Sequence, residues 1–397
     1  MVQLNDILSC PDNTDALANQ IISGQEYDIL QKAIQNLSID DQKLVFTQKF
    51  LKSLIALYSK IDIKNMQAIG EFIVKTLKDK MFFEQEVYQT RVELSKVYEG
   101  MNQPYLAGQI LAQVNYDSPK LQLSVKEKAE KYLQIITFFF EMEEQTAAET
   151  WISKAGNINY DQIDDKYFKF RYENLFAVNL DFQRKFLPAA QKYYNLSNYP
   201  DIDFEEANLL LNAASQCAIL GNAGPLRTRI LATLYKDERI QSIPNFEMLE
   251  LTYMQRIVSK EQKDKFAGSL KKHQLQILRE NFTVLDEAIL QHNITAVSQV
   301  YESITMKSLS RLVYIGRDIV NSNKLNQKNQ NKFKNFTKKV EVCIQTMIEE
   351  KRINAKIDQL IDTVSFQRDE DIPVDFNDRI SQFCGRLNEF YEKITAK

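Results

Sequence analysis

Small residues recur about every 40 residues in the middle of the chain, and this period restricts the possible folds more than any other feature. Each cluster follows a longer segment of helical apolar periodicity and opens a shorter one. Small side chains at a fixed point of a repeat let two helices approach closely. The clusters are Ala107–Gln109, Ala147–Glu149 and Ala189–Gln191. We therefore expect a right-handed, tetratricopeptide-like helical solenoid over residues 81–280, preceded by separate N-terminal helices in residues 1–80.

Composition agrees with closely linked helices. The chain has only ten Gly and eight Pro in 397 residues, so it contains few helix breakers. Its formal charge of -3 gives no general attraction to phosphate or anionic lipid. It has no run near the roughly 20 apolar residues of a membrane span, and its N-terminus lacks a basic region followed by an apolar one. An intracellular protein without a membrane segment is the expectation.

Residues 281–368 have the pattern of a winged helix. Leu285, Ala288, Ile289 and His292 share one helical face. Asn293 suits a left-handed C-cap, and the helical period restarts at Thr295. Thr305 then stands where the N-cap of a third helix belongs, and Val340 begins the stripe of a fourth. The period next changes from 3.6 to 2, which predicts a two-stranded ribbon. Its alternating apolar residues are Ile353, Ala355, Ile357, Val364 and Phe366.

A polar segment interrupts this module. Residues 317–339 are rich in Asn and Lys, and such a composition buries too little apolar surface to order itself. We expect a disordered, solvated insertion there, with a nucleic-acid-binding arm as the less favoured interpretation.

The last segment, residues 374–397, carries a heptad stripe that predicts one amphipathic helix. An isolated helix of this length is marginal in water, so another surface must cover its apolar face. That surface is either the chain itself or a bundle with partner subunits, and we favour the bundle. The stripe consists of Phe376, Ile380, Phe383, Leu387, Phe390 and Ile394.

No motif in the chain predicts catalysis, a cofactor or a metal. His273 and His292 are too far apart for a zinc motif, and there is no glycine-rich phosphate loop. The cysteines are too widely spaced for a disulfide framework or a zinc knuckle. At a helix end, His292 is better explained as a hydrogen-bonded structural residue than as a catalytic one.

The winged helix favours a protein partner over nucleic acid. Its fourth helix carries Glu341, Glu349 and Glu350 against Lys351 and Arg352, whereas base and phosphate contacts need cationic and amide side chains. The ribbon also leaves an open edge that a strand of another chain can extend. We therefore expect the five ribbon residues named above to form a subunit contact.

A charged helix end follows the repeats. Lys236, Asp237, Glu238 and Arg239 are either a solvated helix terminus or an ion-paired elbow between the solenoid and the winged helix. The sequence leaves both interpretations open.

Helical repeats that lead into a winged helix and end in an amphipathic helix resemble the PCI family of scaffold subunits. The segments Arg184–Phe186, Arg229–Arg239 and Leu285–Ala288 resemble its signalosome branch. The segments Ile304–Lys307 and Ala355–Asp358 also resemble the proteasome lid branch, which is the alternative. The charged helix end favours the signalosome.

This resemblance implies a non-catalytic subunit in a complex that removes a ubiquitin-like modifier from cullins. It implies that other PCI subunits and a zinc isopeptidase subunit are partners, and that cullin-RING ligases are the substrate. It also implies a protein of the cytoplasm and nucleus, with the winged helix in a ring of like modules and the terminal helix in a shared bundle.

Overall fold

The computed structural model consists mainly of helices joined by short turns. The described residues are 31–32, 34–35, 44–57, 63–78, 80–121, 123–158, 160, 166–200, 202–279, 282–313, 327–367 and 384. Within these ranges, no helix is long and apolar enough to cross a membrane. The chain divides into two compact units, Met1–Asn179 and Leu180–Lys397.

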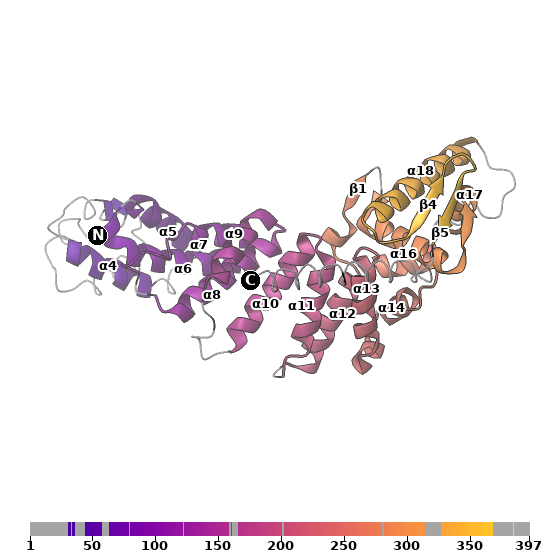
Figure 1. The fold of residues 1–397 in the computed structure, drawn as a ribbon. Coiled ribbons are helices and arrows are strands. Elements are labelled where there is room, and N and C mark those ends of the chain that lie inside the picture. The colour runs from indigo at the N-terminus through magenta and orange to yellow at the C-terminus, as the bar shows by residue number, and fades with distance from the viewer. Residues whose placement is uncertain are drawn as a thin grey trace, which may run out of the picture. The chain divides into compact units, whose positions relative to one another are not determined.

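Pairs of one long and one short helix build most of the described part of the first unit (Figure 1). The long helices α6 and α8 have 17 residues each, and their partners α7 and α9 have 9 and 12. Ala107 in α7 and Ala148 in α9 are fully buried, which confirms that small residues lie where paired helices meet. The elements are α4 (Leu44–Ala56), α5 (Ile63–Leu77), η3 (Met81–Phe83), α6 (Glu84–Gly100), α7 (Pro104–Ala112), α8 (Val125–Glu141), α9 (Gln145–Gly156) and α10 (Lys166–Phe182), which crosses the boundary between the units.

The turns inside three helix pairs are alike. Asn102, Glu143 and Arg184 stand 41 residues apart, and each has a φ near +60°. In each turn the next residue donates its N–H to a carbonyl five residues back, which closes the long helix with a left-handed cap. These bonds are Gln103 to Tyr98 at 2.9 Å, Glu144 to Phe139 at 3.0 Å and Lys185 to Leu180 at 2.9 Å. The repeat is therefore present in the backbone conformation of the turns as well as in the positions of the small residues.

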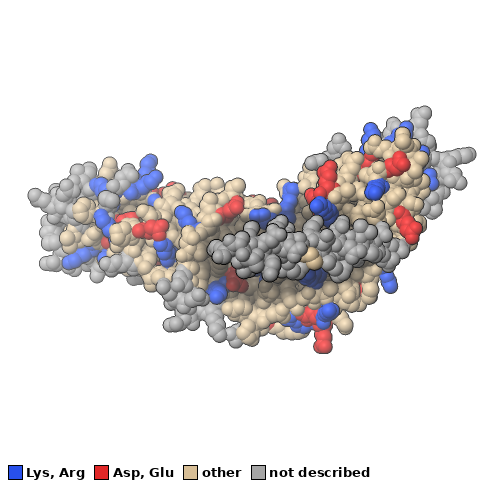
Figure 2. All heavy atoms as spheres, in the orientation of Figure 1, with Lys and Arg blue, Asp and Glu red and all other residues tan. Residues whose placement is uncertain are grey.

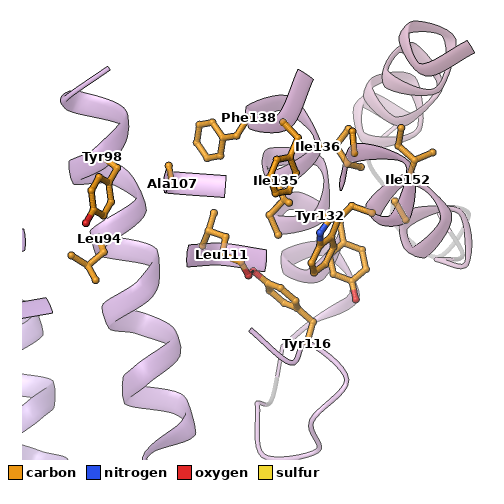
Figure 3. Close-up of a cluster of buried hydrophobic side chains, with 14 residues drawn as sticks. Leu94, Tyr98, Ala107, Leu111, Tyr116, Tyr132, Ile135, Ile136, Phe138 and Ile152 are labelled. Atoms are coloured by element: carbon orange, nitrogen blue, oxygen red, sulfur yellow. The ribbon is translucent and has the colours of Figure 1, made fainter. Parts of the chain in front are cut away.

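Aromatic side chains fill the core between α7, α8 and α9 (Figure 3). Tyr116, Tyr132 and Trp151 meet edge to face, with ring centroids 5.2 to 5.9 Å apart. Such packing adds roughly 0.5–1.5 kcal/mol per pair to the burial of the rings. The Tyr116 hydroxyl donates to the Leu111 carbonyl at 3.1 Å, so its polar end is satisfied inside the core. This cluster joins consecutive repeats.

The second unit continues the helices and then leads to the winged helix. Asp181, at the end of α10, is buried and accepts hydrogen bonds from Gln274 Nε2 at 2.9 Å and His273 Nε2 at 3.0 Å. These bonds attach the segment that precedes the winged helix to the repeats. The elements are α11 (Phe186–Ser197), α12 (Phe204–Leu220), α13 (Pro225–Tyr235), η5 (Glu238–Ser242), α14 (Phe246–Tyr253), α15 (Lys260–Ala267), η6 (Lys272–Leu275), β1 (Ile277–Arg279) and β2 (Phe282–Thr283).

The predicted winged helix is confirmed. Three helices pack on an antiparallel sheet in the order β3-β5-β4, so β5 is the central strand (Figure 1). The Thr305 hydroxyl accepts the Ser308 N–H at 3.3 Å, as its predicted N-cap role requires. Leu290, Leu309 and Ile344, one from each helix, are at most 1% exposed in the shared core. The elements are α16 (Val284–Val300), β3 (Ser303–Thr305), α17 (Met306–Val313), α18 (Gln327–Glu349), β4 (Ala355–Asp358) and β5 (Thr363–Phe366).

Two expectations for this module are wrong. α16 continues through Asn293 as one helix, because the Asn293 side chain is buried and hydrogen-bonds the backbone of Val258. The ribbon also has a third strand, β3, whose three residues Ser303–Thr305 are too short to produce a clear alternating pattern.

The expected disorder of residues 317–339 is wrong for its second part. α18 begins at Gln327, and Phe336 packs against the winged-helix core. Lys and Gln are good helix formers, so this polar composition is compatible with a helix once aromatic residues anchor one face. Residues 317–326 lie outside the described part of the chain.

The left-handed turn at Glu143 gives a stability prediction. Glu143 is exposed, and a non-glycine residue in this conformation costs about 1–2 kcal/mol. We expect Glu143→Gly to raise the free energy of unfolding by about 0.5–1 kcal/mol, after the larger chain entropy of unfolded glycine is subtracted. Denaturant unfolding of the full chain measures the change.

Glu144→Gly is the matched control. Glu144 is also exposed but has a φ of -82°, so glycine there gains nothing in the folded state and should destabilise. Equal shifts of the unfolding midpoint for both variants would contradict the argument from backbone strain.

Candidate protein-binding site

β4 forms an outer strand of the winged-helix sheet. Gln367 donates its N–H to the Asn354 carbonyl at 2.8 Å, and bonding in an antiparallel pair alternates from one residue to the next. The N–H and C=O groups of Ala355 and Ile357 therefore point away from β5. In the part of the chain that the structure describes, β4 pairs with β5 alone.

A groove of about 770 Å³, which we name the α18 groove, lies beside this strand. One wall is the last turns of α18, with Ile348 and Glu349, and the other is β4. Lys356 and Asp358 are exposed, whereas Ala355 is buried, as the alternation of a strand requires. The site thus combines unpaired backbone groups, an apolar floor and charges of both signs.

The five side chains predicted to form the edge contact mostly face inward. Ala355, Val364 and Phe366 are at most 7% exposed within the winged-helix core. Ile353 and Ile357 are partly buried and pack against the same core. The sequence pattern thus identified β4 and β5. The groups of β4 that a partner can reach, however, are backbone N–H and C=O groups and the exposed side chains of Lys356 and Asp358.

The turn between β4 and β5 exposes two large apolar residues. Asp358 Oδ1 accepts the N–H of Leu360 at 2.9 Å and of Ile361 at 3.4 Å, which fixes the turn. Leu360 is 97% exposed and Ile361 is 65% exposed. Sequence reasoning missed this apolar tip because it searched for alternation only. Two apolar residues between Asp358 and Asp362 were the available signal.

A polar joint attaches the winged helix to the repeats. Gln291 Oε1 in α16 accepts the Ala223 N–H at 3.2 Å and an Arg352 Nη1–H at 2.7 Å. Arg352 also donates to the Ala223 carbonyl at 3.4 Å. The joint therefore connects the α12–α13 turn, α16 and the end of α18. The sequence analysis missed it, although Gln291 was visible as a polar residue next to a buried stripe.

Of the two interpretations of residues 236–239, the structure does not support an elbow between the repeats and the winged helix. Asp237 and Arg239 form an ion pair at 2.7 Å, and the hydrogen bond from Arg239 lowers the pKa of Asp237. Arg239 donates further to the Ser197 carbonyl at 2.9 Å. The pair thus connects η5 to the end of α11, inside the repeats. Lys236 and Glu238 are exposed.

His292 is a structural residue, as the sequence suggested. It is 3% exposed, and its Nε2–H donates to the Arg256 carbonyl at 2.9 Å. Burial, reinforced by the nearby Arg227 charge, lowers its pKa to about 4. Arg227 is itself buried and donates to the Ala218 and Ile219 carbonyls at 3.1 and 2.8 Å.

Two other features bear on function. Among the described residues, no cluster of His, Cys, Asp and Glu could hold a metal ion. The predicted C-terminal helix, residues 374–397 with its heptad stripe, lies almost entirely outside the described residues.

Stacked helical repeats that lead into a winged helix with an open strand define the class of PCI-domain scaffold proteins. The PCI domain model matches residues 270–368, and the model "PSMD12/CSN4, N-terminal" matches residues 3–205. The chain therefore belongs to the PSMD12/CSN4 family, whose signalosome members are non-catalytic scaffold subunits.

Several relatives support this assignment. COP9 signalosome complex subunit 4 of Dictyostelium discoideum is 28% identical over 393 residues, which cover 99% of this chain and 94% of that protein. The subunit 4 of Arabidopsis thaliana is 27% identical over 389 residues, covering 96% and 93%. That of Neurospora crassa is 34% identical over 275 residues, covering 69% and 58%.

The buried His292 predicts a pH dependence of stability. Its folded pKa of about 4 lies below the unfolded value of 6.5, so the unfolded chain binds the proton first as the pH falls. The contribution of His292 to the free energy of unfolding is fully present above pH 6.5. It decreases towards pH 4, by about 3 kcal/mol in total. Unfolding free energies measured from pH 7.5 to 4 test this window.

His292→Gln keeps a donor for the Arg256 carbonyl but does not titrate, so it serves as the comparison. The variant should lose less stability than the wild type over this range. Parallel curves for the two proteins would show that His292 does not cause the dependence.

Proposed function

We propose that the chain is a structural subunit of a signalosome-type complex and binds a neighbouring PCI subunit through the outer edge of β4. One observation carries this proposal: the outward backbone groups of Ala355 and Ile357 lie beside the α18 groove. Membership of the PSMD12/CSN4 family and near full-length similarity to subunit 4 relatives support the choice of complex.

Strand addition suits the chemistry of this edge. An incoming strand would pair with the outward N–H and C=O groups of β4, which supplies affinity that is independent of sequence. The α18 groove could receive alternate side chains of that strand, and Lys356 and Asp358 could select partners of complementary charge. The exposed Leu360 would extend the contact beyond the sheet.

The other contacts follow from the organisation of the chain. The helix predicted over residues 374–397 would join a bundle with partner subunits and so cover its heptad stripe. Catalysis would belong to a separate zinc isopeptidase subunit, and this chain would support cullin deneddylation on cullin-RING ligases in the cytoplasm and nucleus. The repeats would provide the surface that reaches towards that substrate.

Two alternatives are less well supported. A proteasome lid subunit fits the same fold, and the family model that matches the N-terminal half includes PSMD12. A nucleic-acid-binding winged helix would need a concentrated basic surface. The fourth helix is not acidic over its full length, because α18 carries Lys334, Lys338 and Lys339 as well as Glu341 and Glu349. On the face in Figure 2, however, Lys and Arg are interspersed with Asp and Glu.

Affinity purification of the tagged full chain, followed by mass spectrometry, tests the choice of complex. We expect other PCI subunits, a zinc isopeptidase subunit and cullins to be recovered together. Phe383→Asp with Leu387→Asp should abolish this recovery by placing charges on the heptad stripe.

The control for that experiment is Gln382→Asp with Asn388→Asp, which adds the same charges off the stripe. Recovery of proteasomal ATPases in place of cullins would select the lid. Undiminished recovery with the stripe variant would refute the bundle.

Ile357→Pro tests strand addition at β4. Proline removes an N–H that points away from β5 and is tolerated at an edge strand, so the winged helix should remain folded. We expect recovery of one neighbouring PCI subunit in a pull-down to fall at least about tenfold, as the loss of strand hydrogen bonds implies.

Ile357→Ala is the matched control, because it removes more of the partly buried side chain but keeps the N–H. It should retain most of the binding. Equal losses for the two variants would mean that the side chain, and not the strand edge, makes the contact.

A further inference from the structure

A second groove lies within the first unit, independent of the winged helix. It has a volume of about 450 Å³ and is bordered by the end of α5, by α6 and by the turn between α7 and α8. Arg91 of α6 lines this groove and is only 4% exposed. We name this site the α6 groove.

The guanidinium of Arg91 lacks a partner. Within the described residues it makes no hydrogen bond or ion pair, and its Nε is buried without an acceptor. Arg227 in the second unit is equally buried but donates to two carbonyls. An unmet buried donor on a cation is costly to the fold, so the Arg91 guanidinium is a candidate group for binding an anion.

The charges around the α6 groove favour the same ligand. Three cationic residues, Lys78, Lys80 and Lys120, line it. Of the lining carboxylates, Glu84 accepts a hydrogen bond from the Ser118 hydroxyl at 2.8 Å, and Asp117 pairs with Lys128 outside the groove. By formal charge, the four cationic residues that line the groove, Arg91 included, outnumber its two carboxylates.

The walls between these charges are apolar. Leu77, Val87 and Leu121 line the α6 groove together with Arg91. Apolar walls suit the carbon chain behind a carboxylate, whereas a hydrated phosphate would require polar groups on several sides. We propose that the α6 groove binds a Glu or Asp side chain of an acidic peptide, with Arg91 holding the carboxylate through its planar fork.

Fluorescence anisotropy with the full chain tests this site. The probe is a labelled, terminally blocked peptide, Gly-Leu-Glu-Leu-Gly, and its counterpart carries Gln in place of Glu. We expect saturable binding of the Glu peptide and at least about tenfold weaker binding of the Gln peptide, as the loss of a charged hydrogen bond implies. This comparison needs no variant of the protein.

Arg91→Met then separates a binding role from a structural one. Because the variant lacks the guanidinium, binding of the Glu peptide should weaken at least about tenfold. Because it also removes an unpaired buried charge, the unfolding midpoint should be unchanged or higher. Arg171→Met, in α10 and outside the groove, should change neither affinity nor specificity.

Three results would overturn the proposal. They are equal binding of the Glu and Gln peptides, preferential binding of a phosphoserine peptide or of inorganic phosphate, and a lower unfolding midpoint for Arg91→Met.

Discussion

The close pairing of a long helix with a short one is the constraint on which the rest of the molecule depends. Buried small residues such as Ala107 and Ala148 allow the approach, and a left-handed residue after α6, α8 and α10 turns the chain back. Between these turns, residues of α6, α7, α8 and α9 pack into one cluster, in which Tyr116, Tyr132 and Trp151 meet. These contacts join successive helix pairs through one hydrophobic core.

The position of the winged helix depends on buried hydrogen bonds as well as on apolar packing. Gln291 accepts hydrogen bonds from the Ala223 N–H and the Arg352 guanidinium, and Asn293 hydrogen-bonds the backbone of Val258. Apolar contact alone would tolerate several orientations of α16, whereas each of these bonds is directional. We infer that they define the position of the module relative to α12 and α13, both in the second unit.

Part of this architecture follows from sequence and part does not. The small-residue period, the Thr305 cap and the strands at Ala355 and Val364 could be predicted, because each depends on neighbours in the chain. The role of Asn293 could not be predicted, because its hydrogen-bond partner Val258 is 35 residues away. The start of α18 was missed because composition does not show that Phe336 packs against the core.

The choice of β4 over β3 as the proposed contact edge rests on geometry. β3 is only three residues long, and α17 begins at Met306 immediately after it, so an incoming strand could pair over a short distance only. β4 has four residues, a groove beside it and an exposed apolar tip at Leu360. Side chains of an added strand alternate between two faces, so one set could enter the groove while the other remained in solvent. Of the two outer strands described in this sheet, β4 offers both unpaired backbone groups and a groove for side chains.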